Sequence, residues 1–259
     1  MKILVCVKHV MDSESKIRIN DSGTWVEHLS STRFEMNPFD AYAIEEALRI
    51  KERFSESCIH VITVGRDDAQ ETLRRALGMG ADEGIHIVDN RTGYRPPSLA
   101  ASWIASWAKN KGYGLILTGI MSSDEMNAQT GPMIAEMLSI PFCSAVISEK
   151  ISDDKKMVSV ERETEGGARD MFDIELPSVL TIQTGINLPR YPALSKVLRA
   201  KKKELEIIDS SVFDKNATGV ALQRIRCPEK KRKGIFLDGT RQEKVDQLID
   251  ILKKKALLQ

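Results

Sequence analysis

One stretch of the sequence gathers the side chains best suited to binding a small ligand. It combines hydroxyl, carboxylate, amide and glycine groups, follows an apolar run and leads into a helical pattern. An ordinary strand-to-helix connection needs only about 2 to 6 residues. Backbone N–H groups in the first turn of the helix, at residues 129–131, could hold a phosphate. We therefore predict a binding loop made of Gly119, Ile120, Met121, Ser122, Ser123, Asp124, Glu125, Met126, Asn127, Ala128, Gln129, Thr130 and Gly131.

A second polar group marks the start of a predicted helix. Asn37 suits the N-cap, Pro38 the first helical position and Asp40 the third, with Phe39 between them, as in a capping box. Capping alone accounts for these four residues, and the local pattern favours it. A helix N-terminus that faces a crevice is also a site for an anion or a ribose.

The sequence offers no recognisable catalytic or metal-binding motif. It has no GxSxG, Walker or HExxH pattern, its four histidines are scattered, and its four cysteines form no CxxC pair. The glycines of residues 78–84 resemble a dinucleotide fingerprint but lie between a helix and a strand, which favours a helix C-cap. We predict a binding site without a catalyst, no metal site, and buried thiols in a reducing compartment.

Three short basic clusters stand out. Lys201, Lys202 and Lys203 follow a proline-bracketed segment that contains Leu194, and an apolar anchor rimmed by charge is typical of a docking site. By itself this pattern leaves a docking site and a plain solvated cluster equally open. The cluster at 253–255 suits the last turn of a helix, where cations complement the helix dipole, and another cluster lies at 230–233.

Buried strands and amphipathic helices alternate through the first half of the chain, which predicts a doubly wound, mostly parallel α/β sheet. In such sheets ligands bind beyond the carboxyl ends of the strands, which here places Lys8, Gly65 and Gly119 at the crevice. The predicted strands are 3–7, 59–64, 84–88 and 115–118, and the predicted helices are 39–54, 69–77, 97–109 and 128–138.

The second half of the chain has a different pattern of predicted strands and helices. Runs at 146–151, 157–162 and 171–176 predict an antiparallel meander, followed by a strand at 179–183, a short helix at 194–201 and a terminal helix at 241–257. We expect residues 1–208 to form the nucleotide-binding domain and residues 209–259 to form an arm that packs against a second chain.

Composition narrows the possible partners. The 259 residues include 38 Lys and Arg against 37 Asp and Glu, a net charge of +1, which disfavours nucleic acid as a partner. Apolar runs are too short to span a bilayer, so we expect no membrane insertion. The N-terminal run 1–8 resembles a strand more than a signal peptide, so we expect a cytoplasmic location.

Several ordered motifs resemble the β subunit of the electron transfer flavoprotein. The similarity covers residues 1 to about 208, and a weaker similarity extends to the terminal helix. It rests on residues 7–8 with 16–18, 36–39 with 45–47, 76–82, 124–131, 160–163 with 166–167, and 189–203.

The resemblance implies an adenine-nucleotide-hydrolase-like (Rossmann-like) α/β fold that binds AMP, or a second FAD in electron-bifurcating members. It also implies a heterodimer in which this chain helps cradle the FAD of an α subunit. The implied nucleotide contacts are the binding loop up to Thr130 together with Cys6, Lys8, Asn37, Pro38, Phe39, Asp40, Val64 and Gly65.

The family's recognition loop corresponds to residues 187–203, and Leu194 matches the leucine that anchors an acyl-CoA dehydrogenase. The other docking residues implied in this way are Pro189, Arg190, Tyr191, Lys201, Lys202 and Lys203. The implied function is that of a non-catalytic electron carrier in fatty acid oxidation, which accepts electrons from the dehydrogenase and passes them toward the respiratory chain.

Two alternatives stay open. A bifurcating flavoprotein would use NADH as donor, and the segment 234–239 is similar to such members. A stand-alone adenine-nucleotide-binding regulatory protein would carry no flavin. The AMP-containing type is the one we favour.

Overall fold

The computed structural model describes all residues except 28, 214–219, 229–233 and 256–259. The basic cluster at 230–233 and the end of the predicted terminal helix therefore lie outside the described residues. The chain divides into two units, Met1–Ile225 and Arg226–Gln259. The first unit extends beyond residue 208, and the assignment of residues 209–259 to an arm stays a prediction.

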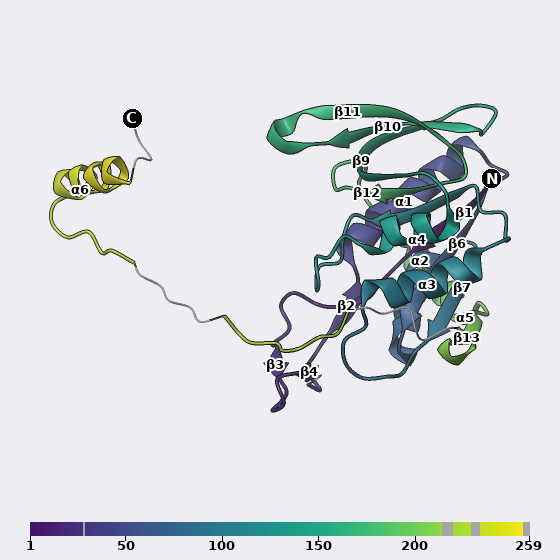
Figure 1. Cartoon of the computed structure of the whole chain (residues 1–259), viewed down its shortest axis with the longest axis horizontal. Coiled ribbons are helices and arrows are strands. Elements are labelled where there is room, and N and C mark those ends of the chain that lie inside the picture. The colour runs from purple at the N-terminus through teal and green to yellow at the C-terminus, as the bar shows by residue number, and fades with distance from the viewer. Residues whose placement is uncertain (28, 214–219, 229–233, 256–259) are drawn as a thin grey trace. The chain divides into compact units, whose positions relative to one another are not determined.

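Nine strands of the described residues form one large sheet. They are β1 (Lys2–Cys6), β6 (Cys58–Gly65), β7 (Glu83–Val88), β8 (Leu115–Gly119), β9 (Phe142–Ile151), β10 (Met157–Glu163), β11 (Arg169–Glu175), β12 (Ser178–Ile182) and β13 (Glu206–Asp209). Their order is β11-β10-β9-β12-β8-β1-β6-β7-β13 (Figure 1). Every pair from β9 to β13 is parallel, and β10 and β11 add an antiparallel meander at one edge. The predicted α/β fold with its meander is confirmed.

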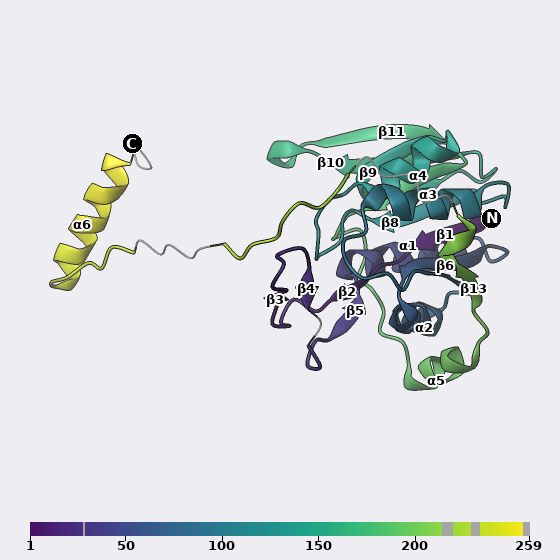
Figure 2. The same cartoon turned by 60° about the horizontal axis from the view of Figure 1, so that its bottom comes forward.

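Helices cover both faces of the sheet (Figures 1 and 2). On one face α1 (Pro38–Arg53) and α2 (Gln70–Met79) bury an apolar stripe against β1 and β6, and on the other α3 (Pro97–Ala108) and α4 (Thr130–Leu138) do the same. Residues of β1 alternate between the two cores, with Ile3 and Val5 in one and Leu4 in the other. Burial on both faces explains why the central strands are continuous apolar runs.

Several short elements of the first unit were not predicted. β13 pairs in parallel with β7 and becomes the edge of the sheet. Two small ribbons lie outside the sheet, one of β2 (His9–Met11) with β5 (Phe34–Met36) and one of β3 (Arg18–Ile19) with β4 (Val26–Glu27). The helix predicted from residue 128 begins only at Thr130, because Met126 and Ala128 adopt left-handed conformations. Short 3₁₀ turns are η1 (Asp67–Ala69), η2 (Glu165–Gly167) and η3 (Ser210–Val212). The short helix that was predicted at 194–201 is α5 (Leu194–Lys202), which packs against α2.

Among its described residues, the second unit contains the amphipathic helix α6 (Arg241–Lys254). A capping box starts it: the Thr240 backbone N–H donates to Glu243 Oε2 at 2.7 Å, and the Glu243 N–H donates back to Thr240 Oγ1 at 3.4 Å. Val245, Leu248 and Ile249 fall on one stripe, and all three side chains are exposed. A free apolar stripe on a capped helix is the pattern of a helix that packs on another surface.

Across the part of the chain that the structure describes, no helix combines the length and the apolar composition needed to cross a bilayer.

Candidate functional site

The candidate site lies where β8, β1 and β6 end side by side. Because these neighbours are parallel, their carboxyl ends meet at one edge of the sheet, which brings Gly119, Lys8 and Gly65 to the same crevice. α1 begins beside them, and the Asn37 backbone N–H donates to the Lys8 carbonyl oxygen at 2.9 Å.

Asp40 joins the ends of two strands. One carboxylate oxygen accepts a hydrogen bond from the Lys8 backbone N–H at 2.7 Å, and the other accepts from the Gly119 N–H at 3.1 Å. Burial raises the pKa of Asp40 to about 7, although hydrogen bonds from Lys8, Asn37 and Gly119 oppose the shift. The carboxyl group therefore fastens β1 to β8 beneath the crevice.

Asn37 fastens the binding loop in the same way. Its side-chain amide donates to the Met121 carbonyl oxygen at 2.9 Å, and its side-chain oxygen accepts from the Ser123 N–H at 3.1 Å. α1 does begin at Pro38, but the Asn37 side chain makes no capping hydrogen bond, so the predicted capping box is wrong. Its polar atoms are used by the loop, and the buried Asn37 and Asp40 side chains hold the crevice together from below.

Lys8 reaches across the crevice to the binding loop. Its Nζ lies 2.9 Å from Asp124 Oδ1, 3.5 Å from Glu125 Oε1 and 3.3 Å from Ser122 Oγ. Burial is the largest cause that raises the pKa of Glu125. This arrangement places a cation, two carboxylates and a hydroxyl at the mouth of the crevice.

Two glycines allow the loop to lie close to the sheet. A Cβ on Gly119 would lie 2.5 Å from Asp40 Oδ1, and a Cβ on Gly131 would lie 2.6 Å from Thr181 Cγ2 and 3.0 Å from Thr118 Oγ1. Gly131 thus seats the first turn of α4 directly on the strand ends. The N–H groups of such a turn have no partners inside their own helix and point out of its end.

Other predicted residues line the neighbouring strand ends. The Cys6 thiol at the end of β1 is buried, which raises its pKa. Val64 and Gly65 close β6, and the Gly65 carbonyl oxygen accepts from His86 Nε2 at 3.1 Å and from the Asp89 N–H at 2.9 Å. In the described residues no three His, Cys, Asp or Glu side chains are grouped to hold a metal ion.

Two aromatic residues near the loop were missed by sequence reasoning. Tyr94 hydrogen-bonds Asn127, and burial and then the Glu125 carboxylate raise its pKa. The ring of Trp25 lies 6.0 Å from that of Tyr94. Residues after β7 lie at the same edge of the sheet, so the rule that selected the ends of the other strands could also have selected Tyr94.

The predicted docking residues fall into two groups. Arg190 bonds Glu45 of α1, and Lys203 Nζ donates to the Asp82 carbonyl oxygen at 2.9 Å, so both contact their own chain. Pro189 is half-buried beside Arg190. The other members, Tyr191, Leu194, Lys201 and Lys202, are exposed, and Lys203 is exposed as well. Leu194 is 74% exposed at the first residue of α5.

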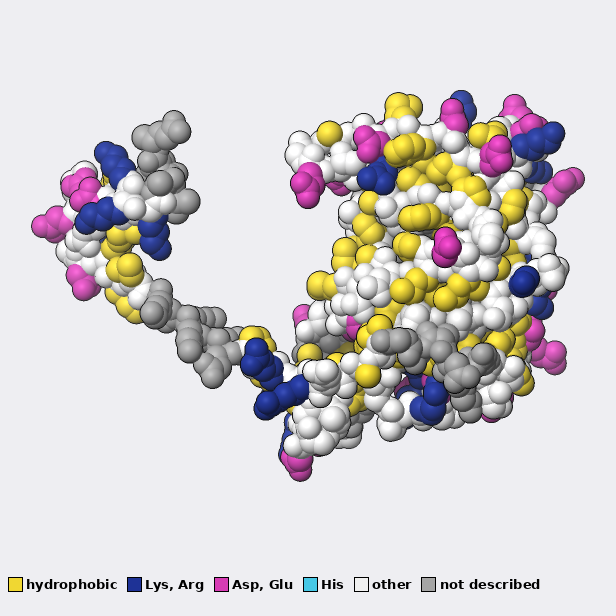
Figure 3. Space-filling view, viewed as in Figure 1, with side chains coloured by type: hydrophobic (Ala, Val, Ile, Leu, Met, Phe, Trp, Pro, Cys, Tyr) yellow, Lys and Arg dark blue, Asp and Glu magenta, His cyan; other side chains and the backbone are white. Residues whose placement is uncertain are grey.

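A separate apolar surface lies on the meander side of the first unit. Figure 3 shows hydrophobic side chains gathered over α4, β9 and β10. The exposed apolar side chains on this side are Met137 of α4, Phe142 of β9 and Met171 of β11, whereas Phe172, the next residue of β11, points to the opposite face of the sheet. Large exposed apolar patches mark interaction surfaces more often than free surface.

The fold and the crevice define an α/β protein with a polar crevice at the carboxyl edge of a parallel sheet, held by residues of one helix. A family profile described as "Electron transfer flavoprotein domain" matches residues 24–212. The chain is 34% identical over 259 residues to the mitochondrial electron transfer flavoprotein subunit beta of Oryza sativa subsp. indica, covering 99% of both chains. It is 32% identical to the electron transfer flavoprotein subunit beta of Bacillus subtilis, with 99% of both covered, and 32% identical to that of Bos taurus, covering 93% of this chain and 94% of the other.

The chain therefore belongs to the electron transfer flavoprotein β-subunit family, as its motifs indicated. Relatives of this name are electron carriers.

Proposed function

We propose that this chain is the β subunit of a heterodimeric electron transfer flavoprotein that binds AMP in the crevice. The observation that carries the nucleotide proposal is the pair of buried side chains, Asn37 and Asp40, that hold the loop 119–131 against the ends of β1 and β8. These buried polar groups fix the conformation of one loop, which is typical of a binding site.

The chemistry of the crevice fits a nucleotide. The ammonium of Lys8 and the N–H groups of residues 129–131 suit a phosphate. The carboxylates of Asp124 and Glu125, 3.5 Å or less from Lys8 Nζ, suit the hydroxyls of a ribose. In this proposal Lys8 exchanges one of its carboxylate partners for the phosphate, and the loop closes over the ribose.

The exposed apolar surfaces of this chain are the parts that would contact the α subunit. The surface of Met137, Phe142 and Met171 supports an interface that helps cradle the FAD of that subunit. The FAD supplies the redox chemistry, and this chain binds, orients and excludes water without forming a bond of its own. The one-faced helix α6 supports an arm that packs on the partner.

Docking of an acyl-CoA dehydrogenase is the third part of the proposal. Leu194 and Tyr191 are exposed apolar side chains next to Lys201 and Lys202, so an apolar pocket with an acidic rim would fit this surface. Electrons accepted from that enzyme would pass through the heterodimer toward the respiratory chain, and a cytoplasmic location in a bacterial-type cell is expected.

The test is a co-expressed heterodimer whose cofactors are extracted and counted. One FAD and one AMP per heterodimer are expected. Two flavins would instead support the bifurcating alternative with NADH as donor. A chain that purifies alone and without flavin would support the regulatory alternative.

Leu194→Ala tests docking directly. Burying a leucine contributes about 1.5–3 kcal/mol, so the KM of the dehydrogenase for the heterodimer should rise roughly 10- to 100-fold. Ile17→Ala is the control, because Ile17 is also an exposed aliphatic side chain but lies outside the recognition loop 187–203. Equal KM values for the two variants would refute the docking role.

A further inference from the structure

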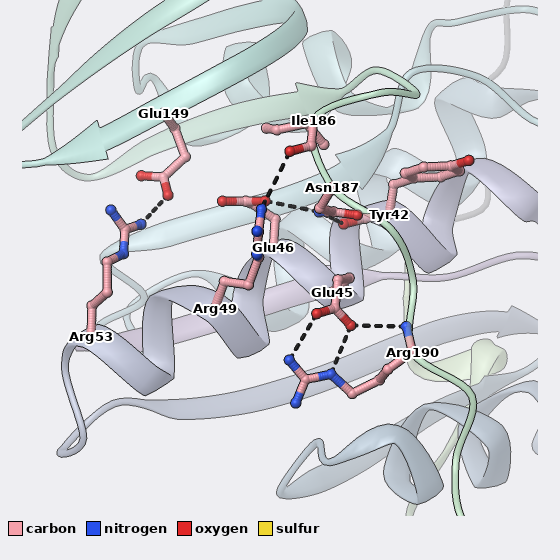
Figure 4. Close-up of polar contacts among 9 residues, drawn as sticks. All are labelled: Tyr42, Glu45, Glu46, Arg49, Arg53, Glu149, Ile186, Asn187 and Arg190. Carbon is pink, nitrogen blue, oxygen red and sulfur yellow. Dashed lines mark hydrogen bonds and ion pairs between the residues drawn. The ribbon is translucent and has the colours of Figure 1, made fainter.

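The segment before Leu194 is tied to α1 by a chain of polar contacts (Figure 4). Arg49 Nη1 donates to the Ile186 carbonyl oxygen at 3.3 Å. One residue later, the Asn187 side-chain amide donates to the Tyr42 carbonyl oxygen at 3.0 Å and to Glu46 Oε2 at 2.8 Å. α1 therefore holds the chain just before it reaches the docking residues.

The strongest tie is between Glu45 and Arg190. Arg190 Nη2 and Nε donate to the two carboxylate oxygens of Glu45 at 2.7 and 2.8 Å, and the Arg190 backbone N–H donates to Oε2 at 3.1 Å. The Glu45 side chain is 6% exposed, whereas Glu52, which accepts from Arg190 Nη1 at 2.8 Å, is 60% exposed. A buried bidentate pair fixes geometry, and an exposed pair contributes little.

The other end of the segment is held by α2. Arg74 Nη1 donates to the Ala200 carbonyl oxygen at 2.8 Å and also contacts that of Lys203. Lys203 Nζ in turn donates to the Asp82 carbonyl oxygen at 2.9 Å. A Cβ on Gly78 would lie 3.4 Å from Val197 Cγ2, so α5 lies close on α2. Leu194 stands between two fixed ends.

We propose that Glu45 is a positioning residue for partner docking: with Arg190 it fixes the entry of the docking segment, so that Leu194 is presented in its docking position before the partner arrives. This inference rests on the proposed docking function. Fixing the segment in advance removes from each encounter the loss of conformational freedom that a loose loop would suffer. Glu45 itself does not touch the partner.

The test uses the purified heterodimer with an acyl-CoA dehydrogenase as donor. Glu45→Gln should raise the KM for the heterodimer about tenfold, equal to about 1.4 kcal/mol, and leave kcat and flavin content unchanged. Arg190→Lys, which keeps the charge but loses the two-point contact, should do the same. Glu52→Gln is the matched control, which removes only the exposed partner of Arg190 and should change KM less than threefold.

Trypsin gives a second readout, because the segment carries Lys196 and Arg199. Cleavage there should be faster in Glu45→Gln and Arg190→Lys than in the parent or in Glu52→Gln. If the Glu45→Gln chain does not assemble into the heterodimer, the Arg190→Lys variant alone tests the positioning role.

Three possible results distinguish the positioning role from the docking function on which it rests. A raised KM with unchanged kcat and faster cleavage supports positioning. Parental KM and cleavage in both variants, with Leu194→Ala still impaired, overturn positioning and leave docking intact. If Leu194→Ala is also unimpaired, docking is wrong and the positioning role falls with it.

Discussion

Replacement of Asp40 by Asn tests whether one buried carboxyl group holds the crevice together. Asp40 is 5% exposed and accepts from two backbone N–H groups, those of Lys8 and Gly119. Asn has a single acceptor oxygen, so one of these N–H groups would face an NH₂ group. A buried donor without an acceptor costs about 1–3 kcal/mol. The loop beside Lys8 should loosen, and affinity for AMP should fall at every pH.

The same variant has a pH signature whose sign follows from the raised pKa. The folded-state pKa of Asp40 is about 7, above its ordinary value of 3.8, so the native state holds its proton more tightly than the unfolded chain. The contribution of Asp40 to wild-type stability is then fully present below about pH 4 and is lost as the pH rises through 7, by about 4 kcal/mol in all. Roughly 2.5 kcal/mol of this loss lies between pH 5 and pH 8. Asn does not titrate and loses nothing.

Denaturant unfolding of the full chain at pH 5, 6, 7 and 8 measures this effect. Groups shared by the two proteins cancel in the difference between variant and wild type. That difference should move in favour of Asp40→Asn by roughly 2.5 kcal/mol from pH 5 to pH 8. Asp21→Asn, at an exposed site, is the control and should show no trend. Parallel curves for Asp40→Asn and wild type would refute the buried, proton-holding carboxyl.

Two further substitutions test the packing around the site and the carboxyl pair of α1 and β9. Gly119→Ala would place a Cβ 2.5 Å from Asp40 Oδ1, so we expect a loss of about 1–3 kcal/mol in unfolding free energy and loss of bound AMP. Gly234→Ala, which enters open space, should lose neither, and equal melting temperatures of the two variants would contradict the close packing. The Glu149 side chain is 1% exposed, and burial followed by its hydrogen bond with Glu46 raises its pKa to about 7, so its own contribution to wild-type stability is lost as the pH rises from 4.5 through 7. Glu149→Gln should therefore gain roughly 2 kcal/mol over wild type from pH 5 to pH 8 in the same unfolding assay, and a constant difference would exclude a shared proton.

The predicted elements that the structure reproduces are those with a strong local pattern. β1, β6 and β8 are covered on both faces and so appear as continuous apolar runs, and α1 begins at the proline that marks its first turn. β13 was missed because three of its four residues are exposed and it becomes a strand only by pairing with β7. The ribbon of β2 and β5 was also missed, because its two strands are separated by 22 residues and become strands only by pairing with each other.

The sequence by itself determined the central strands of the sheet and the family, and it predicted the edge at which a ligand would bind, because these depend on periodicity and on motifs of consecutive residues. Tertiary structure decided what the polar side chains do. Asn37 reads as a helix cap, yet it bonds residues 84 and 86 positions away. Arg190 reads as a docking cation, yet its guanidinium bonds Glu45, 145 positions away. A hydrogen-bond donor takes the acceptor that lies nearest in space, and only the folded chain brings these acceptors within reach.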